Sequence, residues 1–410
     1  MRVLISGAGI AGNTLAWFLA KTGARVVIVE KSQSILPHGQ SVDVKDDALT
    51  VIKKMGLMDQ VLRFNTTEQG TQFIGDKGQP LARFPLRKGY ASSPTSEFEI
   101  LRGDLAMILH EAASRLSGVE YMFGTTIQDV ISNDDDTVKV SLSNGEVHEF
   151  DLLVAADGQW SKIRKQCFPA KDVNAVDVGM YAAYYTVPRL PSDNDWWNVY
   201  LGLGSRLIST RPDPHGNIRA MFTRVPRCKV QENMWLEASR SGREEQGELL
   251  RKEFADAGWQ ASRLLDAMDQ APDFYFHGIQ QIKMSNWSNS RVVCVGDAAY
   301  CPSPLTGEGT PLAITGAYVL AAELSKLDEG EHPAKALVAY ESTFRPFVDE
   351  GQKIPSILPA MMHPESSWAR YFYHTILWAL SRVLVVPGLA IKSSDIDGHD
   401  SKFPWSKWDL

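Results

Sequence analysis

The chain opens with a glycine-rich turn between an apolar strand and a helix, and this unit constrains the fold more than any other feature. The apolar run 3–5 is followed by Gly7, Gly9 and Gly12, which form a G-x-G-x-x-G pattern, and the next apolar run ends on Glu30. In such a unit the first glycine permits a tight turn, the second lets a pyrophosphate approach the backbone, and the third lets the helix pack on the strand. The pattern predicts a dinucleotide site and leaves NAD and FAD open.

Two further glycine signatures follow at the ends of predicted strands. Asp157-Gly158 follows an apolar run, and Gly296-Asp297 follows another. An acid in this place can bind a hydroxyl of a polyol chain such as ribitol. The stretch Pro304 to Gly309 then precedes a long predicted helix, whose N-terminus favours an electron-rich ligand atom. A reduced flavin suits this arrangement better than nicotinamide does.

In this order, the three signatures resemble those of the group A FAD-dependent monooxygenases, which have the para-hydroxybenzoate hydroxylase fold. The pattern is most similar to the tetracycline-inactivating branch, which shares the stretches 102–105 and 161–165. The resemblance implies an α/β fold, in which a Rossmann-like FAD-binding domain is interleaved with a β-sheet substrate domain and followed by a C-terminal helix. We expect 1–70, 100–178 and 286–365 to form the FAD-binding domain, 71–99 and 179–285 the substrate domain, and 366–410 a C-terminal helical segment.

The resemblance also implies a set of cofactor-binding residues. Glu30, with Lys31 beside it, would hold the adenosine ribose, and Arg102 would reach the FAD phosphates or ribityl chain. Asp43 would lie near the flavin, and Asp297 near the ribityl or pyrophosphate region. The complete expected set is Gly7, Gly9, Ala11, Gly12, Glu30, Lys31, Asp43, Arg102, Asp157, Asp297, Pro304, Gly307, Gly309 and Thr310.

Three positions depart from the pattern of the family. Tyr300 replaces the usual histidine after G-D-A-A, and Glu308 replaces the usual glutamine between the late glycines. The polar residues that grip tetracycline in that branch are missing from the corresponding strands, where 200–204 stands instead. FAD binding is still expected because backbone contacts do most of that work, but tetracycline is not the predicted natural substrate.

The implied activity is that of an FAD-dependent monooxygenase that uses NADPH or NADH and O2. A C4a-hydroperoxyflavin would transfer one oxygen atom to an aromatic or polyketide-like small molecule in secondary metabolism, and we identify no catalytic side chain from the sequence. Baeyer–Villiger insertion or epoxidation is the alternative reaction. A flavin-binding sensor or scaffold without turnover is the alternative from another class.

The composition of the chain excludes some classes of binding partner. The chain has 42 basic and 49 acidic residues and no basic stripe, so we expect no nucleic acid. The four cysteines show no metal-ligand spacing, and Met1 leads directly into a strand, which predicts a cytoplasmic protein without a bound metal. The stretch 375–391 is apolar but interrupted by Arg382 and Pro387. We expect an amphipathic helix that docks on the protein; a membrane-surface anchor is the alternative, and membrane contact is not expected.

The remaining candidates have ordinary structural explanations. His215 lies in a turn signal, and we expect both it and His277 to be structural rather than general bases. Cys301 has no neighbouring base and is expected to be an inert thiol. The aromatic residues of 181–200 should mostly be sheet core, with some lining a substrate pocket. Periodicity further predicts helices over 46–55, 104–116, 243–257, 262–268, 309–327 and 334–348, a hairpin of 71–74 with 81–84, and strands over 274–282 and 291–295.

Overall fold

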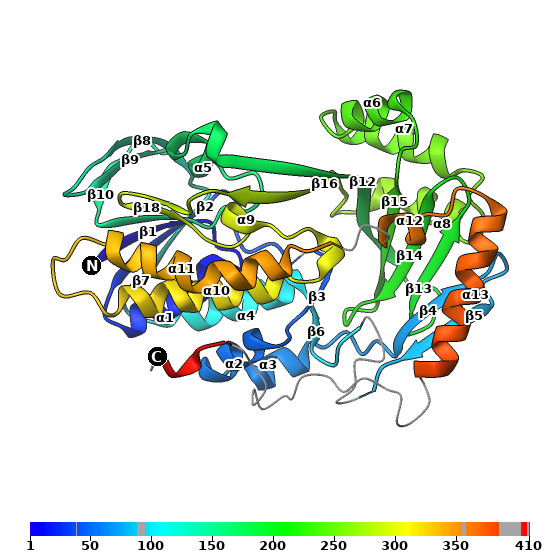
Figure 1. Ribbon diagram of the computed structural model, residues 1–410, viewed down its shortest axis with the longest axis horizontal. Helices are drawn as coiled ribbons and strands as arrows, with labels where there is room; N and C mark the ends of the chain where they lie inside the picture. Colours follow the sequence, from blue (N-terminus) through cyan, green and yellow to red (C-terminus); the bar gives the residue numbers. More distant parts are fainter. Residues whose placement is uncertain (38, 88–94, 355–357, 385–402, 408–409) are drawn as a thin grey trace.

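The computed structural model describes residues 1–37, 39–87, 95–354, 358–384, 403–407 and 410. A six-stranded sheet forms one half of the molecule (Figure 1). Its order is β17 (Ser288–Asn289), β18 (Val292–Cys294), β11 (Leu152–Ala155), β1 (Arg2–Ser6), β2 (Arg25–Glu30) and β7 (Val119–Phe123). All neighbours are parallel except β17 and β18. The strands in the middle of this sheet are buried apolar runs, as expected for a parallel sheet covered on both faces.

Helices and a small sheet cover the two faces of the six-stranded sheet. Figure 1 shows the helices on one side; they are α1 (Ile10–Lys21), α4 (Arg102–Ser114), α10 (Gly309–Leu324) and α11 (Ala334–Gly351). On the other side lie β8 (Ile127–Asn133), β9 (Val138–Leu142), β10 (Val147–Phe150) and α5 (Lys162–Cys167). α10 is buried along almost its whole length and packs on both α1 and α11. Its apolar sequence is therefore that of a central helix rather than of an amphipathic one.

A seven-stranded sheet forms the other half of the molecule. Its order is β16 (Tyr275–Met284), β12 (Val173–Pro188), β15 (Asn217–Arg224), β14 (Arg206–Pro212), β13 (Trp197–Gly202), β4 (Gly70–Ile74) and β5 (Pro80–Pro85). All neighbours are antiparallel except β13 and β4, which are parallel. One face, here called the outer face, packs on α6 (Lys229–Ala238), α7 (Arg243–Phe254) and α8 (Ala261–Ala267) around Tyr185, Phe222 and Trp235.

Several segments connect the two halves. The long strands β12 and β16 pair with each other between them (Figure 1). A short antiparallel pair, β3 (Ser41–Asp43) with β6 (Glu99–Leu101), adds a second connection. The remaining elements are the eighteen-residue helix α13 (Ser367–Leu384), the short helices α2 (Asp47–Lys54), α3 (Met58–Arg63), α9 (Asp297–Tyr300) and α12 (Leu358–Met362), and the 3-10 turns η1 (Ala170–Asp172), η2 (Met268–Gln270), η3 (Pro304–Thr306) and η4 (Trp405–Lys407).

Most of the expected elements are confirmed, with shifts of a few residues at their ends. The β4–β5 hairpin, α7, α8 and β16 are present, whereas α6 was not predicted because its sequence mixes polar and apolar residues without a clear period. The predicted C-terminal helix begins at Ser367, and the stretch 385–391 lies outside the described residues. None of the described helices combines the length and the apolar character that crossing a lipid bilayer requires.

Candidate cofactor and substrate site

The three glycines of the first turn have different surroundings. Gly7 has φ +107°, and a Cβ on Gly12 would lie 2.0 Å from the Gly7 carbonyl oxygen. Both residues are therefore glycine because the backbone leaves no room for a side chain. A Cβ on Gly9 would instead have only the Arg102 guanidinium within reach, at 4.0 Å. The space in front of Gly9 is thus open, and the Arg102 guanidinium borders it.

The helix that begins at this turn carries free donors at its N-terminus. Gly9 is the N-cap of α1 and supplies no side-chain cap, so backbone N–H groups of the first turn remain available. Glu30 at the end of β2 organises the turn instead: one carboxylate oxygen accepts from the Ala8 amide at 3.0 Å and the other from the Ser32 amide at 3.0 Å. Lys31 beside it is exposed. The N-terminus of α1 therefore offers a site for an anionic group.

Asp297 and Arg102 reach the same region from two other segments. Asp297 begins α9 after β18, and its burial raises its pKa while the positive charge of Arg102 lowers it. A Cβ on Gly309, the first residue of α10, would lie 4.0 Å from Asp297 Oδ1, and one on Gly296 would lie 3.1 Å from the Ala11 Cβ. The first and third glycine signatures thus meet around α1, which also packs on α10.

Asp157, from the second signature, has one carboxylate oxygen bonded and one free. Its Oδ2 accepts from the Lys162 amide at 2.8 Å, whereas its Oδ1 is buried and has no hydrogen-bond partner among the described residues. Burial raises the pKa of this carboxyl group. It lies close to the first turn, because a Cβ on Gly7 would be 3.1 Å from the Asp157 Cα. A buried acceptor without a partner is costly unless a ligand or water bonds it.

An ion pair that the sequence did not reveal joins the segment just after β3 to the late glycine loop. Lys45 Nζ lies 2.6 Å from Glu308 Oε1, and both side chains are half-buried. Burial lowers the pKa of Lys45, but the Glu308 carboxylate outweighs this and raises it. Asp43, two residues before Lys45, accepts a hydrogen bond from Ser96 Oγ at 2.8 Å. Gly307, with φ +67°, completes the turn next to Lys45.

A buried charged cluster lies behind Asp43. Arg211 of β14 donates to Glu68 at 2.9 and 3.1 Å and also bonds Glu99, and its guanidinium lies 4.2 Å from the centre of the Trp197 ring. Glu99 is directly opposite Asp43 in the β3–β6 pair. Burial raises the pKa of Glu99 well above its ordinary value, although Arg211 lowers it. The cluster joins the two halves of the molecule, and no local pattern predicts it because each residue comes from a different segment.

The face of the seven-stranded sheet opposite to the outer face is here called the inner face. Its register brings Ser209 of β14, Met221 of β15 and Tyr184 of β12 side by side, and Trp197 and His277 lie on the same face. Tyr184 packs in one apolar cluster with Leu305 of the late loop, and Trp197 and Met221 pack in another with Met362 and Tyr373. The inner face is therefore enclosed by the late loop and the C-terminal helices.

Three polar atoms of the inner face are buried without a hydrogen-bond partner among the described residues: Trp197 Nε1, Ser209 Oγ and His277 Nδ1. Two of them belong to side chains that can donate and accept, and the third is a donor only. Such groups stand out because nearly all buried polar atoms in proteins are hydrogen-bonded. They are available to bind a ligand with hydroxyl or carbonyl oxygens. The sequence offered no signal for them beyond the aromatic richness of this region.

His277 gives the protein a measurable acid sensitivity. Burial lowers its pKa from 6.5 to about 4. Between these values the unfolded chain binds a proton that the folded chain does not, so stability falls as pH decreases through this window. We expect His277→Gln to recover about 2 kcal/mol of the stability that is lost between pH 7 and pH 5.

Thermal unfolding followed by circular dichroism at several pH values tests this. Burial also lowers the pKa of His363 to about 4, and the His363 ring bonds Thr223 at 2.7 Å. His363→Gln should recover a similar amount of stability at low pH only if the glutamine keeps this bond to Thr223. An unchanged slope of melting temperature against pH in His277→Gln would contradict the prediction.

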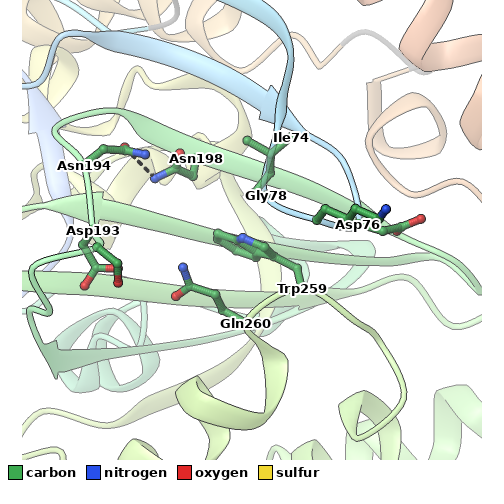
Figure 2. A pocket seen from close by; sticks show the side chains of 10 residues that line it. Ile74, Asp76, Gly78, Asp193, Asn194, Asn198, Trp259 and Gln260 are labelled. Atoms are coloured by element: carbon green, nitrogen blue, oxygen red, sulfur yellow. Dashed lines mark hydrogen bonds between the residues drawn. The ribbon is translucent and has the colours of Figure 1, made fainter.

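A separate cavity of about 400 Å³ opens on the outer face (Figure 2). Its lining includes Asn198, Asp193 and Trp259, and the side chains of Asn198 and Asp193 are bonded within the protein. Asn198 bonds Asn194 at 3.0 Å, and Asp193 pairs with Arg263 at 2.7 Å. Because these groups already have partners, and because the glycine signatures lie on the other side of the sheet, this cavity is not the candidate substrate site.

Comparison with known proteins agrees with this geometry. A family model described as an FAD binding domain matches residues 1–351. A protein of Cercospora beticola named Monooxygenase CTB7 is 37% identical over 394 residues, which cover 92% of this chain and 92% of that protein. A flavin-dependent monooxygenase of Legionella longbeachae serogroup 1 (strain NSW150) is 34% identical over 363 residues, covering 86% of this chain and 87% of that protein.

Solved structures show the same architecture. The tetracycline destructase Tet(55) superposes with a TM-score of 0.76 at 28% identity, covering 96% of this chain and 98% of that one. Klebsiella pneumoniae HpxO, solved with FAD and uric acid, has a TM-score of 0.71 at 21% identity, covering 92% of this chain and 93% of that one. At this identity the second likeness shows the fold alone. The expected α/β fold with a Rossmann-like FAD-binding part is confirmed.

Proposed function

Because this chain belongs to the FAD-dependent monooxygenases, we propose that it uses NADH or NADPH and O2 to insert one oxygen atom into an aromatic or polyketide-like small molecule. The observation that supports this most is that the late glycine loop and the inner face of the seven-stranded sheet meet at one apolar cluster. Leu305 of the glycine-rich late loop and Tyr184 of the inner face both pack on the small apolar cluster of Met180, Ala182 and Ile279. A cofactor held by the late loop would therefore lie next to a sheet face with buried, unpartnered polar atoms.

The residues present fit FAD. The open space before Gly9 suits a pyrophosphate, which the free N–H groups of α1 and the Arg102 guanidinium would bind. The unpartnered Asp157 Oδ1 and the buried Asp297 carboxylate suit hydroxyl groups, which are hydrogen-bond donors. α10 also begins without a side-chain cap, so its N-terminus is free to face an electron-rich ring edge.

We propose the following roles in holding the cofactor. Glu30, aided by Lys31, would bind the adenosine ribose, and Arg102 with Gly9 the phosphates. Asp297 would bind the ribityl region, and Asp43 would lie near the flavin. Gly7, Ala11, Gly12, Asp157, Pro304, Gly307, Gly309 and Thr310 would shape the surrounding backbone. In this proposal 1–70, 100–178 and 286–365 form the FAD-binding domain, 71–99 and 179–285 the substrate domain, and 366–410 the C-terminal segment; the cytoplasmic location stays a prediction.

Bound FAD would supply hydride acceptance from NAD(P)H and activation of O2. The chain itself would orient the substrate and exclude water. Ser209 Oγ and Trp197 Nε1 would bond oxygen atoms of the substrate, and Tyr184 and Met221 would pack on its ring. His277, whose pKa is lowered by burial, would stay neutral near pH 7 and act as a hydrogen-bonding group rather than as a base. Enclosure by Leu305 and Tyr373 would limit access of water.

Purification and turnover test the proposal. We expect the protein to release FAD on denaturation, and one of a panel of phenols and aromatic polyketides to stimulate NADPH or NADH oxidation with one ¹⁸O atom from ¹⁸O₂ in the product. NMR of the product separates hydroxylation from Baeyer–Villiger insertion or epoxidation. Arg102→Ala should weaken FAD binding about 10- to 100-fold. Flavin reduction without any oxygenated product would favour a sensor or scaffold, and absence of FAD would overturn the proposal.

A further inference from the structure

The C-terminal helix α13 has two different faces. Leu377 and Tyr373 pack against β-sheet residues such as Phe84 and Leu201, and Arg370 ties the helix to Asp76 at 2.9 Å. The expectation that this helix docks on the protein is therefore confirmed. Its other face is apolar and exposed: Trp368 77%, Tyr371 73%, Phe372 49%, Trp378 51%, Leu380 45% and Val383 48%. We call these six residues the aromatic ridge.

The aromatic ridge is large for the surface of a soluble protein. Fully exposed side chains of this size offer about 150–250 Å² each if aromatic, so the ridge exposes on the order of 600 Å² or more of apolar surface. Apolar patches of this size usually mark an interaction site. By contrast, other exposed large residues, such as Val230 of α6 and Val338 of α11, stand on elements whose neighbouring positions are mostly polar.

The charge around the aromatic ridge differs from that of the rest of the chain. The protein has a net charge of −7, yet no Asp or Glu occurs between Glu365 and Asp395. Within α13 the charged residues are Arg370 and Arg382, and Arg382 is exposed with its guanidinium 5.6 Å from the Trp378 ring centre. An acid-free apolar surface with an exposed arginine complements an anionic lipid surface, and Trp and Tyr favour the boundary between lipid and water.

The shape of the aromatic ridge favours a bilayer over a second protein. α13 runs along the outer edge of the molecule (Figure 1). Its eighteen residues make a cylinder about 27 Å long, and the exposed side chains spread around its outward side. A stable protein interface needs about 800 Å² per partner with close shape matching, which a single convex helix hardly supplies. A bilayer is soft and can cover the whole ridge.

We propose that the aromatic ridge docks this protein on the surface of an anionic lipid bilayer, with α13 lying in the interface rather than crossing it. Leu377 and Tyr373 on the opposite face of the same helix join an apolar cluster of the inner face that also includes Trp197 and Met221. Docking would therefore place the lipid on one side of α13 and, on its other side, an apolar cluster that includes residues of the candidate substrate site. An apolar substrate dissolved in the membrane would have a short path to that site. The docking itself does not depend on the proposed enzyme activity.

Flotation with lipid vesicles tests the proposal on the full-length holoprotein. We expect the protein to float with vesicles of phosphatidylcholine and phosphatidylserine, and less with phosphatidylcholine alone. The triple variant Trp368→Ser, Tyr371→Ser, Trp378→Ser should bind these vesicles on the order of a thousandfold more weakly, since each of the three aromatic side chains contributes about tenfold when the lipid buries it. Arg382→Gln should reduce binding to the anionic vesicles and leave binding to neutral ones unchanged.

Matched controls separate docking from other effects. The double variant Val230→Ser, Val338→Ser removes two other exposed apolar side chains and should bind vesicles like the wild type. Retained FAD and an unchanged melting temperature show that the triple variant is folded. Wild-type protein that stays with the aqueous fraction overturns the proposal. A dimer in analytical ultracentrifugation that the triple variant abolishes, without vesicle binding by the wild type, assigns the aromatic ridge to a second copy and also overturns it.

Discussion

Gly12→Ala is expected to abolish stable FAD binding and to destabilise the protein even in the absence of FAD. The added methyl group would lie 2.0 Å from the Gly7 carbonyl oxygen and 3.3 Å from Ile5, so α1 must move away from β1. Overpacking of a core by one methyl group already costs about 1–3 kcal/mol, and here the obstacle is backbone that cannot rotate away. The shift also distorts the N-terminus of α1, where we propose that the phosphates bind.

Gly9→Ala is the matched comparison, because both changes add the same group three residues apart. The space around Gly9 is open apart from the Arg102 guanidinium, and its backbone is extended rather than left-handed. We expect the Gly9→Ala apoprotein to unfold at nearly the wild-type temperature and to bind FAD weakly, because its methyl group occupies the path of the pyrophosphate. Flavin content and apoprotein melting temperature distinguish the two. Equal melting temperatures for both variants would contradict the packing role given to Gly12.

Arg211→Met should have the second large effect, on folding stability. The side chain is buried between Glu68 and Glu99, and its removal leaves both acidic side chains buried without their cationic partner. Breaking a buried pair in this way costs about 3–5 kcal/mol. Arg251→Met, which removes an exposed pair with Asp269, should cost less than about 1 kcal/mol. Urea titrations give the free energy of unfolding of both variants, and similar losses in the two would contradict the prediction.

Glu99→Gln should raise the free energy of unfolding at neutral and higher pH, whereas Arg211→Met should lower it. Burial raises the pKa of Glu99, so the folded protein holds this proton more tightly than the unfolded chain does. Stability from this group is complete below its unfolded pKa, near 4.5, and is lost as pH rises toward the folded value. Glutamine keeps the shape and carries no charge. The variant should therefore lose less stability than the wild type between pH 5 and pH 8; a steeper loss would contradict the upward shift of the Glu99 pKa.

The cofactor side of the molecule was largely predictable because its signals are local. Gly7, Gly9 and Gly12 lie within six residues of one another, and a buried strand before a turn with a helix after it is a pattern of spacing alone. The same holds for the β4–β5 hairpin, whose turn residues stand between two apolar runs. The sequence could not predict that Arg102 and Asp297 lie in the same region, because they come from segments far apart in the chain.

The substrate side was not predictable in the same way. Ser209, Met221 and Tyr184 become neighbours only through the register of three strands, and Arg211 meets Glu68 and Glu99 across the junction of two sheets. No period links these positions in the chain. The exposure of the aromatic ridge depends on which side of α13 meets the sheet, so apolar content alone predicted a docked helix without showing its free face.

The parallel pairing of β13 with β4 has a consequence for how the chain is made. The β4–β5 hairpin leaves the ribosome long before β13, so one edge of this hairpin waits without its native partner while α4, β7, β11 and β12 are synthesised. An unpaired strand edge can form hydrogen bonds with the wrong strand. During synthesis, the hairpin is therefore a part of this protein that chaperones would need to protect, and slowing translation before β13 would lengthen that exposure.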